Sequence, residues 1–162
     1  MEKAFFLDRD GVLNKEIGNY AWHEKDFELL PFIFDWLKIL QEQKYLLIVI
    51  SNQGGIGRGR YTKKDVDHVH TLMKQRLEEN NIHLTDIYYC PHHPTSSNCL
   101  CRKPGHLLLE KAIARYHIKP EKSFFIGDSD RDIIAAKHAG VSPIKIQSNE
   151  DPTQQIKKIL HV

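Results

Sequence analysis

The chain alternates between short, continuously apolar runs and longer segments in which apolar residues recur with a helical period. The apolar runs predict buried β-strands, and the amphipathic segments predict helices that cover the sheet. The expected strands comprise residues 3–7, 45–50, 87–89, 123–126 and 144–146, and the expected helices comprise residues 31–44, 62–80, 107–116, 131–139 and a last helix ending at 160. Such alternation is typical of an α/β fold built on a mostly parallel sheet.

Two segments, 14–30 and 90–106, lack either periodicity. Unpatterned loops of this length in a compact domain are usually functional, so we expect both to border a site. The chain shows no internal repeat, low-complexity stretch or interdomain linker. Residues 1–162 are therefore predicted to form one domain.

Composition excludes several classes of protein. The formal net charge of the 162 residues is only +2, which argues against nucleic acid as a partner. No apolar run approaches the roughly 18 residues that a membrane span needs, and the amino terminus has no signal-peptide pattern. Three cysteines crowded into residues 90–101 do not form a disulfide framework. We expect a soluble, cytoplasmic monomer that does not bind membranes.

Carboxylates follow two of the predicted strands. Asp8 and Asp10 end the first apolar run two residues apart, so the alternation of a strand directs both side chains to one side. Asp128 follows the strand at 123–126. Because ligand sites of open α/β sheets lie at the carboxyl ends of the strands, these acids are expected to meet there. Several carboxylates at one point repel each other unless a cation joins them, and hard oxygen ligands suit Mg²⁺.

Other residues near the strand ends are individually ambiguous. Asp130 and Asp132 fall where a helix begins, and for Asp130 we favour a role in capping and dipole compensation. Ser51 and Asn52 end the middle strand, where a hydroxyl and backbone N–H groups could hold a phosphoryl oxygen. Lys103 precedes a helix and could bring positive charge to the same place.

Taken together, four segments resemble the haloacid dehalogenase superfamily of phosphohydrolases: residues 8–12, Ser51-Asn52, Lys103 and residues 127–132, in that order. The resemblance covers nearly the whole chain and implies a Rossmann-like three-layer sandwich. It also implies that Asp8 is a nucleophile forming an aspartyl-phosphate and that Asp10 is the general acid and base.

The same resemblance assigns the remaining roles. Mg²⁺ is expected to be held by Asp8, the backbone carbonyl of Asp10, and Asp128. Charge on the phosphoryl oxygens is expected to be stabilised by Ser51, Asn52 and Lys103. Asp132 is expected to support this site without touching the substrate.

A cluster of sulfur and imidazole groups occupies the second unpatterned segment. Three thiols and an imidazole within twelve residues match a Cys₃His zinc site, whose ligands we predict as Cys90, His92, Cys99 and Cys101. His93 is the competing ligand to His92. Four protein ligands leave no open position, so this Zn²⁺ is predicted to be structural, fixing the loop that presents Arg102 and Lys103.

Neither insertion point of the superfamily carries a large cap domain here, so an open, capless site is expected. The zinc loop and the stretches at 52–59 and 88–94 resemble the branch that contains heptose bisphosphate phosphatases and histidinol-phosphate phosphatases, and are more similar to the heptose members. That branch implies a small phosphorylated metabolite, most simply a sugar bisphosphate used in lipopolysaccharide biosynthesis. Gln53, Arg58 and Arg102 are expected to contact it, the two arginines at a second phosphate.

One departure and two alternatives stand beside this interpretation. Members of the branch tend to carry a basic residue just after the acid at 128, whereas this chain has Ser129. A phosphate-accepting receiver domain would place its acceptor aspartate at the end of a later strand, where Ser51-Asn52 stands. A catalytically silent zinc-binding interaction module would not need Asp8, Asp10 and Lys103 together.

Overall fold

The computed structural model describes residues 1–162, and its centre is a sheet of five parallel strands in the order β3-β2-β1-β4-β5. The strands are β1 (Ala4–Leu7), β2 (Leu46–Asn52), β3 (Asp86–Cys90), β4 (Phe124–Gly127) and β5 (Ser142–Lys145). The order reverses direction at β1, because the chain builds outward to β2 and β3 and then returns to β4 on the other side of β1. This crossover point is where open α/β sheets form ligand crevices.

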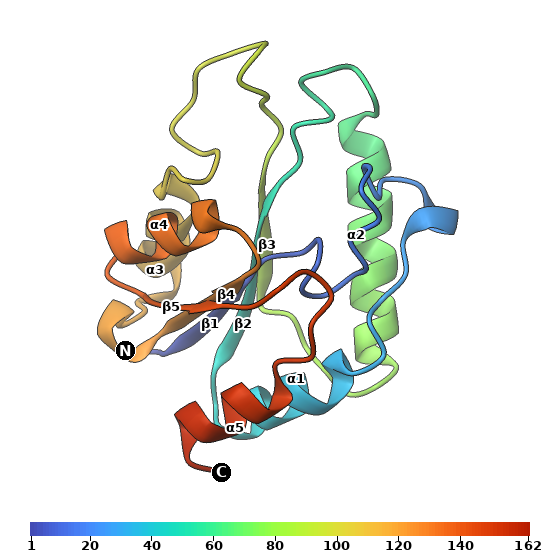
Figure 1. The fold of residues 1–162 in the computed structure, drawn as a ribbon. Coiled ribbons are helices and arrows are strands. Elements are labelled where there is room, and N and C mark those ends of the chain that lie inside the picture. The colour runs from blue at the N-terminus through green and yellow to red at the C-terminus, as the bar shows by residue number, and fades with distance from the viewer.

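Helices cover both faces of the sheet and make three layers (Figure 1). The helices on one face are α1 (Ile33–Glu42), α2 (Lys63–Glu78) and α5 (Thr153–Leu160), and those on the other are α3 (Leu107–Tyr116) and α4 (Asp130–His138). Two 3₁₀ turns, η1 (Glu24–Asp26) and η2 (Pro120–Lys122), lie in the connections. The predicted α/β class is confirmed, and every strand pair is parallel.

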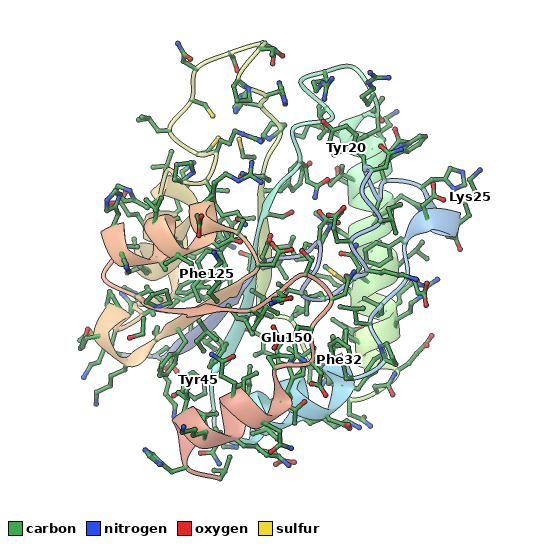
Figure 2. The ribbon with its side chains drawn as sticks, viewed as in Figure 1. Tyr20, Lys25, Phe32, Tyr45, Phe125 and Glu150 are labelled. Atoms are coloured by element: carbon green, nitrogen blue, oxygen red, sulfur yellow. The ribbon has the colours of Figure 1, made fainter.

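The alternation within β1 explains its central position. Phe5 and Leu7 pack into the core beneath α1, α2 and α5, whereas Ala4 and Phe6 pack into the core beneath α3 and α4. All four side chains are fully buried. Phe125 of β4 belongs to the second core and lies on the α3 and α4 side in Figure 2. An apolar run is required here because neither face of the strand meets water.

Local signals set the helix starts. Thr62 caps α2 through a reciprocal capping box with Asp65. Helix α4 begins in the same way, with Ser129 as the cap and Asp132 returning the hydrogen bond. Asp130 was expected to take a role in capping and dipole compensation: it does not cap α4, but it lies in the first turn, where its charge suits the helix dipole, and it pairs with Lys145.

The two unpatterned segments border the carboxyl edge of the sheet. Residues 14–30 contain only η1 and isolated bridges, including one between Asn14 and Leu29. The segment after β3 projects from the same end of the molecule as the loop after β2, while the C-terminus lies at the opposite end (Figure 1). No helix in the structure combines the length and apolarity needed to cross a lipid bilayer.

Candidate active site and metal centre

Asp8 follows β1 directly and is held through one carboxylate oxygen. Its Oδ1 accepts hydrogen bonds from the Arg9 backbone N–H and from Lys103 Nζ, both at 2.8 Å. No protein donor contacts Oδ2, which leaves this oxygen available to an incoming group. Burial raises the pKa of the Asp8 carboxyl to about 7 despite the charge of Lys103. The nearby carboxylates of Asp132 and Asp128 add to that rise.

Asp10 has the opposite electrostatic environment. Its carboxylate accepts hydrogen bonds from Arg9 Nη2 at 2.8 Å, Asn14 Nδ2 at 2.9 Å and Gln53 Nε2 at 3.1 Å. Burial alone would raise the pKa of Asp10, but the Arg9 charge and these three donors outweigh it and hold the pKa below its usual value. The side chain of Asp10 is therefore fixed in its ionised form. It does not belong to the group of candidate metal ligands, which is formed by Asp8, Asp128 and Asp132.

The Arg9 side chain organises this part of the site, and the sequence analysis did not identify it. Arg9 is 1% exposed, and its guanidinium bonds Asp10, the carbonyl of Ala21 and His70. Since Arg9 can only donate, His70 Nε2, 3.3 Å away, must be the unprotonated acceptor. One signal in the sequence could have indicated this role. The alternation of side chains along an extended segment directs position 9 to the side opposite positions 8 and 10 and into the core, where a charged group needs partners.

Lys103 joins two strand ends. Its ammonium lies 2.8 Å from Asp8 Oδ1 and 2.7 Å from Asp132 Oδ1, and it donates to the carbonyl of Ile50. Burial lowers the pKa of Lys103, but the two carboxylates outweigh it and raise the pKa above the ordinary value. The backbone of Lys103 is clamped by Asn52, whose side-chain amide donates to its carbonyl and accepts from its N–H.

Asp128 lies beside these groups and has fewer partners. Burial raises its pKa, although its Oδ2 accepts a hydrogen bond from the Ser148 hydroxyl. Gly11 makes room for it: a Cβ there would come within 2.2 Å of Asp128 Oδ2, and the residue has φ +81°, a conformation that favours glycine.

Three carboxylates form a cluster that fits a divalent cation. Oxygens of Asp8, Asp128 and Asp132 all lie within 4.8 Å of one another. Lys103 neutralises part of this charge, but Asp128 has no cationic partner and its pKa is raised. An all-oxygen donor set with excess negative charge suits Mg²⁺. The sequence-predicted set of Asp8, Asp128 and the Asp10 carbonyl overlaps this cluster in its two carboxylates, and the structure brings Asp132 to the same point.

These groups surround a polar cleft of about 400 Å³. Eight of the residues predicted for the active site line it: Asp8, Asp10, Asn52, Gln53, Arg102, Lys103, Asp128 and Asp132. Residues that the sequence did not single out also line it, among them Glu16, Asn19, Arg131 and Ser148. Tyr20, from the first unpatterned segment, lies near the start of α2 and also borders the cleft (Figure 2).

Two sequence-predicted residues lie outside the cleft lining. Ser51 is fully buried, and its Oγ accepts a hydrogen bond from Gln53 Nε2 at 2.8 Å. Arg58 is exposed and donates to the Tyr20 hydroxyl at 3.2 Å. Gln53 itself receives a hydrogen bond from Tyr61, so it links the middle strand to Asp10. The structure therefore places Ser51 beneath the site and Arg58 beyond its rim.

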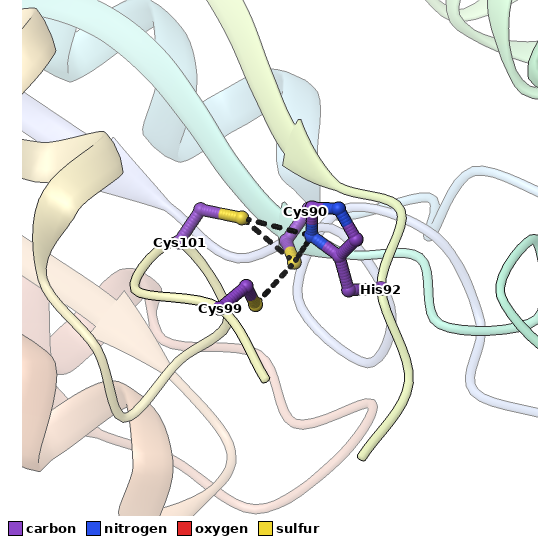
Figure 3. A group of neighbouring side chains, drawn as sticks. All are labelled: Cys90, His92, Cys99 and Cys101. Carbon is purple, nitrogen blue, oxygen red and sulfur yellow. Dashed lines mark hydrogen bonds between the residues drawn. The ribbon is translucent and has the colours of Figure 1, made fainter. Parts of the chain in front are cut away.

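The cysteine and histidine side chains converge on one point (Figure 3). Cys90 Sγ lies 3.6 Å from Cys99 Sγ and 3.1 Å from Cys101 Sγ, and His92 Nδ1 lies 3.4 Å and 3.3 Å from Cys90 and Cys101. A tetrahedral Zn²⁺ with ordinary bond lengths would separate its ligands by about 3.6 to 3.8 Å. The competing His93 bonds Thr95 instead. The four side chains fit a structural zinc site with no open position.

The fold and the carboxylate site define the class of protein as a hydrolase of the haloacid dehalogenase type. The family model described as HAD-hydrolase-like matches residues 100–161. Among solved structures, the D,D-heptose 1,7-bisphosphate phosphatase of B. bronchiseptica, crystallised with magnesium and phosphate, superposes with a TM-score of 0.85 at 28% identity, covering 94% of this chain and 86% of that one.

Curated relatives narrow the class. The chain is 40% identical over 160 residues to D-glycero-beta-D-manno-heptose-1,7-bisphosphate 7-phosphatase of Helicobacter pylori, covering 98% of this chain and 88% of the relative. It is 36% identical to the corresponding alpha-heptose phosphatase of Photorhabdus laumondii, covering 94% and 86%. The chain belongs to the family of D-glycero-D-manno-heptose-1,7-bisphosphate 7-phosphatases. It is a phosphatase, which excludes the receiver-domain and silent-module alternatives.

Proposed function

We propose that this chain hydrolyses the 7-phosphate of D-glycero-D-manno-heptose 1,7-bisphosphate, with Asp8 as nucleophile. The observation that carries the proposal is the arrangement of Asp8: one oxygen is fixed by Lys103 and the Arg9 N–H, and the other faces the cleft without a protein partner. Relatives that act on this sugar bisphosphate span almost the whole chain.

The reaction divides into two displacements at phosphorus. The free oxygen of Asp8 attacks the phosphorus, the bond to the sugar oxygen breaks, and the departing alkoxide takes a proton from Asp10. Water, deprotonated by Asp10, then attacks the aspartyl-phosphate, releasing inorganic phosphate and restoring Asp8. Mg²⁺, when bound by Asp8 and Asp128 with support from Asp132, supplies charge neutralisation for the phosphoryl group.

The environment of Asp10 fits its two tasks in sequence. In the structure its carboxylate is ionised by the hydrogen bonds of Arg9, Asn14 and Gln53, which is the form needed to accept a proton from water. A phosphate dianion in the cleft raises the pKa of a neighbouring carboxyl and lets Asp10 carry a proton to the leaving group. Arg9 holds the carboxylate in place through both states.

The first test is replacement of the nucleophile. Asp8→Asn keeps the side-chain volume and the Lys103 contact but removes the attacking oxyanion, so Mg²⁺-dependent phosphate release is expected to fall by more than about a thousandfold. Asp130→Asn is the matched control, because Asp130 is an exposed acid at the start of α4, after the neighbouring strand β4, and does not line the cleft. Residual Asp8→Asn activity near that of Asp130→Asn, with circular dichroism unchanged for both, would exclude Asp8 as nucleophile.

The substrate is tested by comparing both anomers of the heptose bisphosphate with histidinol phosphate. Higher kcat/KM for either bisphosphate anomer supports the proposal and identifies the preferred anomer. Preference for histidinol phosphate would assign the chain to the other activity that its sequence resembles.

A further inference from the structure

The two carboxylate oxygens of Asp10 are held unequally. Oδ1 accepts hydrogen bonds from Arg9 Nη2 and Asn14 Nδ2, whereas Oδ2 accepts one protein hydrogen bond, from Gln53 Nε2 at 3.1 Å. A carboxylate oxygen has two acceptor positions, so Oδ1 is filled and Oδ2 keeps one position for a proton. The direction in which Asp10 presents that proton to the cleft is therefore set by Gln53.

The amide of Gln53 has no donor left for a substrate. The residue is 2% exposed, and its Nε2 donates to Ser51 Oγ at 2.8 Å as well as to Asp10. An amide nitrogen carries two N–H groups, and these two hydrogen bonds use both of them. Gln53 was expected from the sequence to contact the substrate, but its donors are committed to neighbouring side chains.

Tyr61 determines which end of this amide faces Asp10. The Tyr61 hydroxyl lies 2.8 Å from Gln53 Oε1. A carboxylate accepts hydrogen bonds and does not donate them, so the amide directs its nitrogen to Asp10 and its oxygen to Tyr61, whose hydroxyl donates. Without that hydroxyl, the amide oxygen would be buried with no partner, and the contact that distinguishes the two ends of the amide would be lost.

The Tyr61 ring is fixed by close packing. It is 5% exposed, and a Cβ at Gly55 would come within 2.0 Å of the ring. The Trp22 ring stacks on it with centroids 5.9 Å apart, and the Tyr20 ring meets it edge to face at 5.4 Å. Burial raises the pKa of Tyr61, so the hydroxyl keeps the proton that it donates. Its position leaves the Gln53 amide one favourable orientation.

We propose that Tyr61 is a positioning residue for the general acid and base: its hydroxyl orients the Gln53 amide, and Gln53 in turn orients Oδ2 of Asp10. The inference rests on the proposed function, because Tyr61 has this role only if Asp10 protonates the leaving group. Tyr61 does not line the cleft, so it acts through Gln53 and not on the substrate.

The test compares two leaving groups. A sugar alkoxide needs the proton of Asp10 when it departs, whereas nitrophenolate is stable enough to leave without one. Steady-state kcat/KM with Mg²⁺ is measured for heptose 1,7-bisphosphate and for nitrophenyl phosphate. This quantity covers the steps up to departure of the leaving group, so the later attack of water on the aspartyl-phosphate does not affect it.

Tyr61→Phe removes the hydroxyl and keeps the ring. Its kcat/KM for the bisphosphate is expected to fall about tenfold, mainly through kcat, while that for nitrophenyl phosphate changes by less than about twofold. Tyr116→Phe is the matched control, because it removes a hydroxyl that donates to Asp86 at the amino end of β3, away from the cleft. Combining Tyr61→Phe with Gln53→Leu should cost no more than Gln53→Leu alone, since both changes interrupt one chain of contacts.

Asp10→Asn separates this inference from the proposed function. It should lower the bisphosphate reaction far more than the nitrophenyl reaction; equal losses would mean that Asp10 is not the acid, and both proposals would fail. If Asp10→Asn behaves as expected but Tyr61→Phe keeps the wild-type ratio, lowers both reactions equally, or adds its full loss to that of Gln53→Leu, the positioning role is overturned and the proposed function stands. If wild type does not hydrolyse the bisphosphate, its substrate assignment fails, and the same ratios taken with histidinol phosphate, also an alkyl ester, decide the role of Tyr61.

Discussion

At the scale of single residues, the catalytic edge depends on buried charges that satisfy one another. Arg9 is the largest such group, because its guanidinium joins Asp10, the carbonyl of Ala21 and His70. An arginine with so little contact with water needs partners for its donors, and of the side-chain nitrogens of Arg9 only Nε has none. His70 pairs with Nη1 from α2, and the ring of Tyr89 meets the His70 ring edge to face. Through these contacts the Arg9 side chain joins Asp10 to the neighbouring loop and to α2.

The neutral state of His70 predicts a specific pH dependence of stability. Burial, together with the charges of Arg9 and Lys74 and against the opposing charge of Asp10, lowers the pKa of His70 to about 3. The unfolded chain therefore takes up a proton near pH 6.5 that the folded chain refuses, so stability falls as pH decreases below 6.5. Between pH 7 and pH 5 this contribution amounts to about 2 kcal/mol.

His70→Gln isolates that contribution, because glutamine can still accept from Arg9 but does not titrate. Urea unfolding at pH 7 and pH 5 should show that wild type loses about 2 kcal/mol more than the variant over this interval. The comparison with the variant cancels the effects of the other titrating groups, including the Asp8 carboxyl, whose pKa is raised. Parallel stability curves for the two proteins would mean that His70 is protonated in the folded state.

At the scale of elements, the loop between β3 and α3 carries the candidate zinc ligands and, directly after them, residues of the cleft. Its cluster begins with Cys90 at the end of β3 and finishes with Cys101, and the next two residues are Arg102 and Lys103. The loop is long and has no regular structure of its own, so a Zn²⁺ held by the four side chains of the cluster would supply order to it by cross-linking. Lys103 then reaches Asp8 from a fixed backbone.

The two adjacent histidines give a matched test of this site. His92→Gln removes Nδ1 from the cluster, whereas His93→Gln alters a side chain that bonds Thr95. Mass spectrometry of purified protein should find one zinc ion per chain in wild type and His93→Gln, and substantially less in His92→Gln. Phosphatase kcat/KM of His92→Gln is expected to fall roughly tenfold or more, because the lysine loses its support. Equal zinc content in both variants would exclude His92 as a ligand.

The elements themselves were largely predictable from the sequence. The apolar runs and helical periods located every strand and helix within a few residues, and the range of α3 was predicted without error. The strand expected at 144–146 lies at Ser142–Lys145, because its pairing with β4 includes Ser142, an exposed residue at the sheet edge that no apolar pattern reveals. Strand ends depend on the neighbouring strand as well as on local hydrophobicity.

The site was less predictable, and its residues show why. Acids next to strand ends could be located, since parallel strands share one carboxyl edge. Whether a side chain enters the cleft depends on packing between distant segments: Arg58 turns toward Tyr20, while Arg131 turns into the cleft. Ser51 follows the strand alternation into the interior instead. The direction that each of these side chains takes cannot be predicted from the residues next to it in the sequence.

At the scale of the whole molecule, the sheet separates two hydrophobic cores. One contains residues from α1, α2 and α5, and the other contains residues from α3 and α4. Strands β1 to β4 contribute side chains to both cores, so neither core forms without the sheet. The catalytic edge therefore lies over a scaffold whose two cores are separated by the sheet.

This separation predicts additive mutational effects. Leu40 of α1 and Leu109 of α3 are both fully buried, one in each core, with the sheet between them. Leu40→Ala and Leu109→Ala are each expected to lower the free energy of unfolding by about 2 to 5 kcal/mol, because each leaves a cavity. Since the two sites share no packing partner across the sheet, the double variant should lose the sum to within about 0.5 kcal/mol.

Urea denaturation of wild type, both single variants and the double variant measures this coupling directly. A matched pair within one core, Leu37→Ala with Leu40→Ala, serves as the comparison, because both leucines lie on α1 and belong to the same cluster. That pair should deviate from additivity, since the second cavity forms beside the first. A coupling between Leu40 and Leu109 above about 1 kcal/mol would mean that the sheet transmits a change in one core to the other. In that case, a substitution beneath α3 would also be expected to shift Lys103 and the cleft.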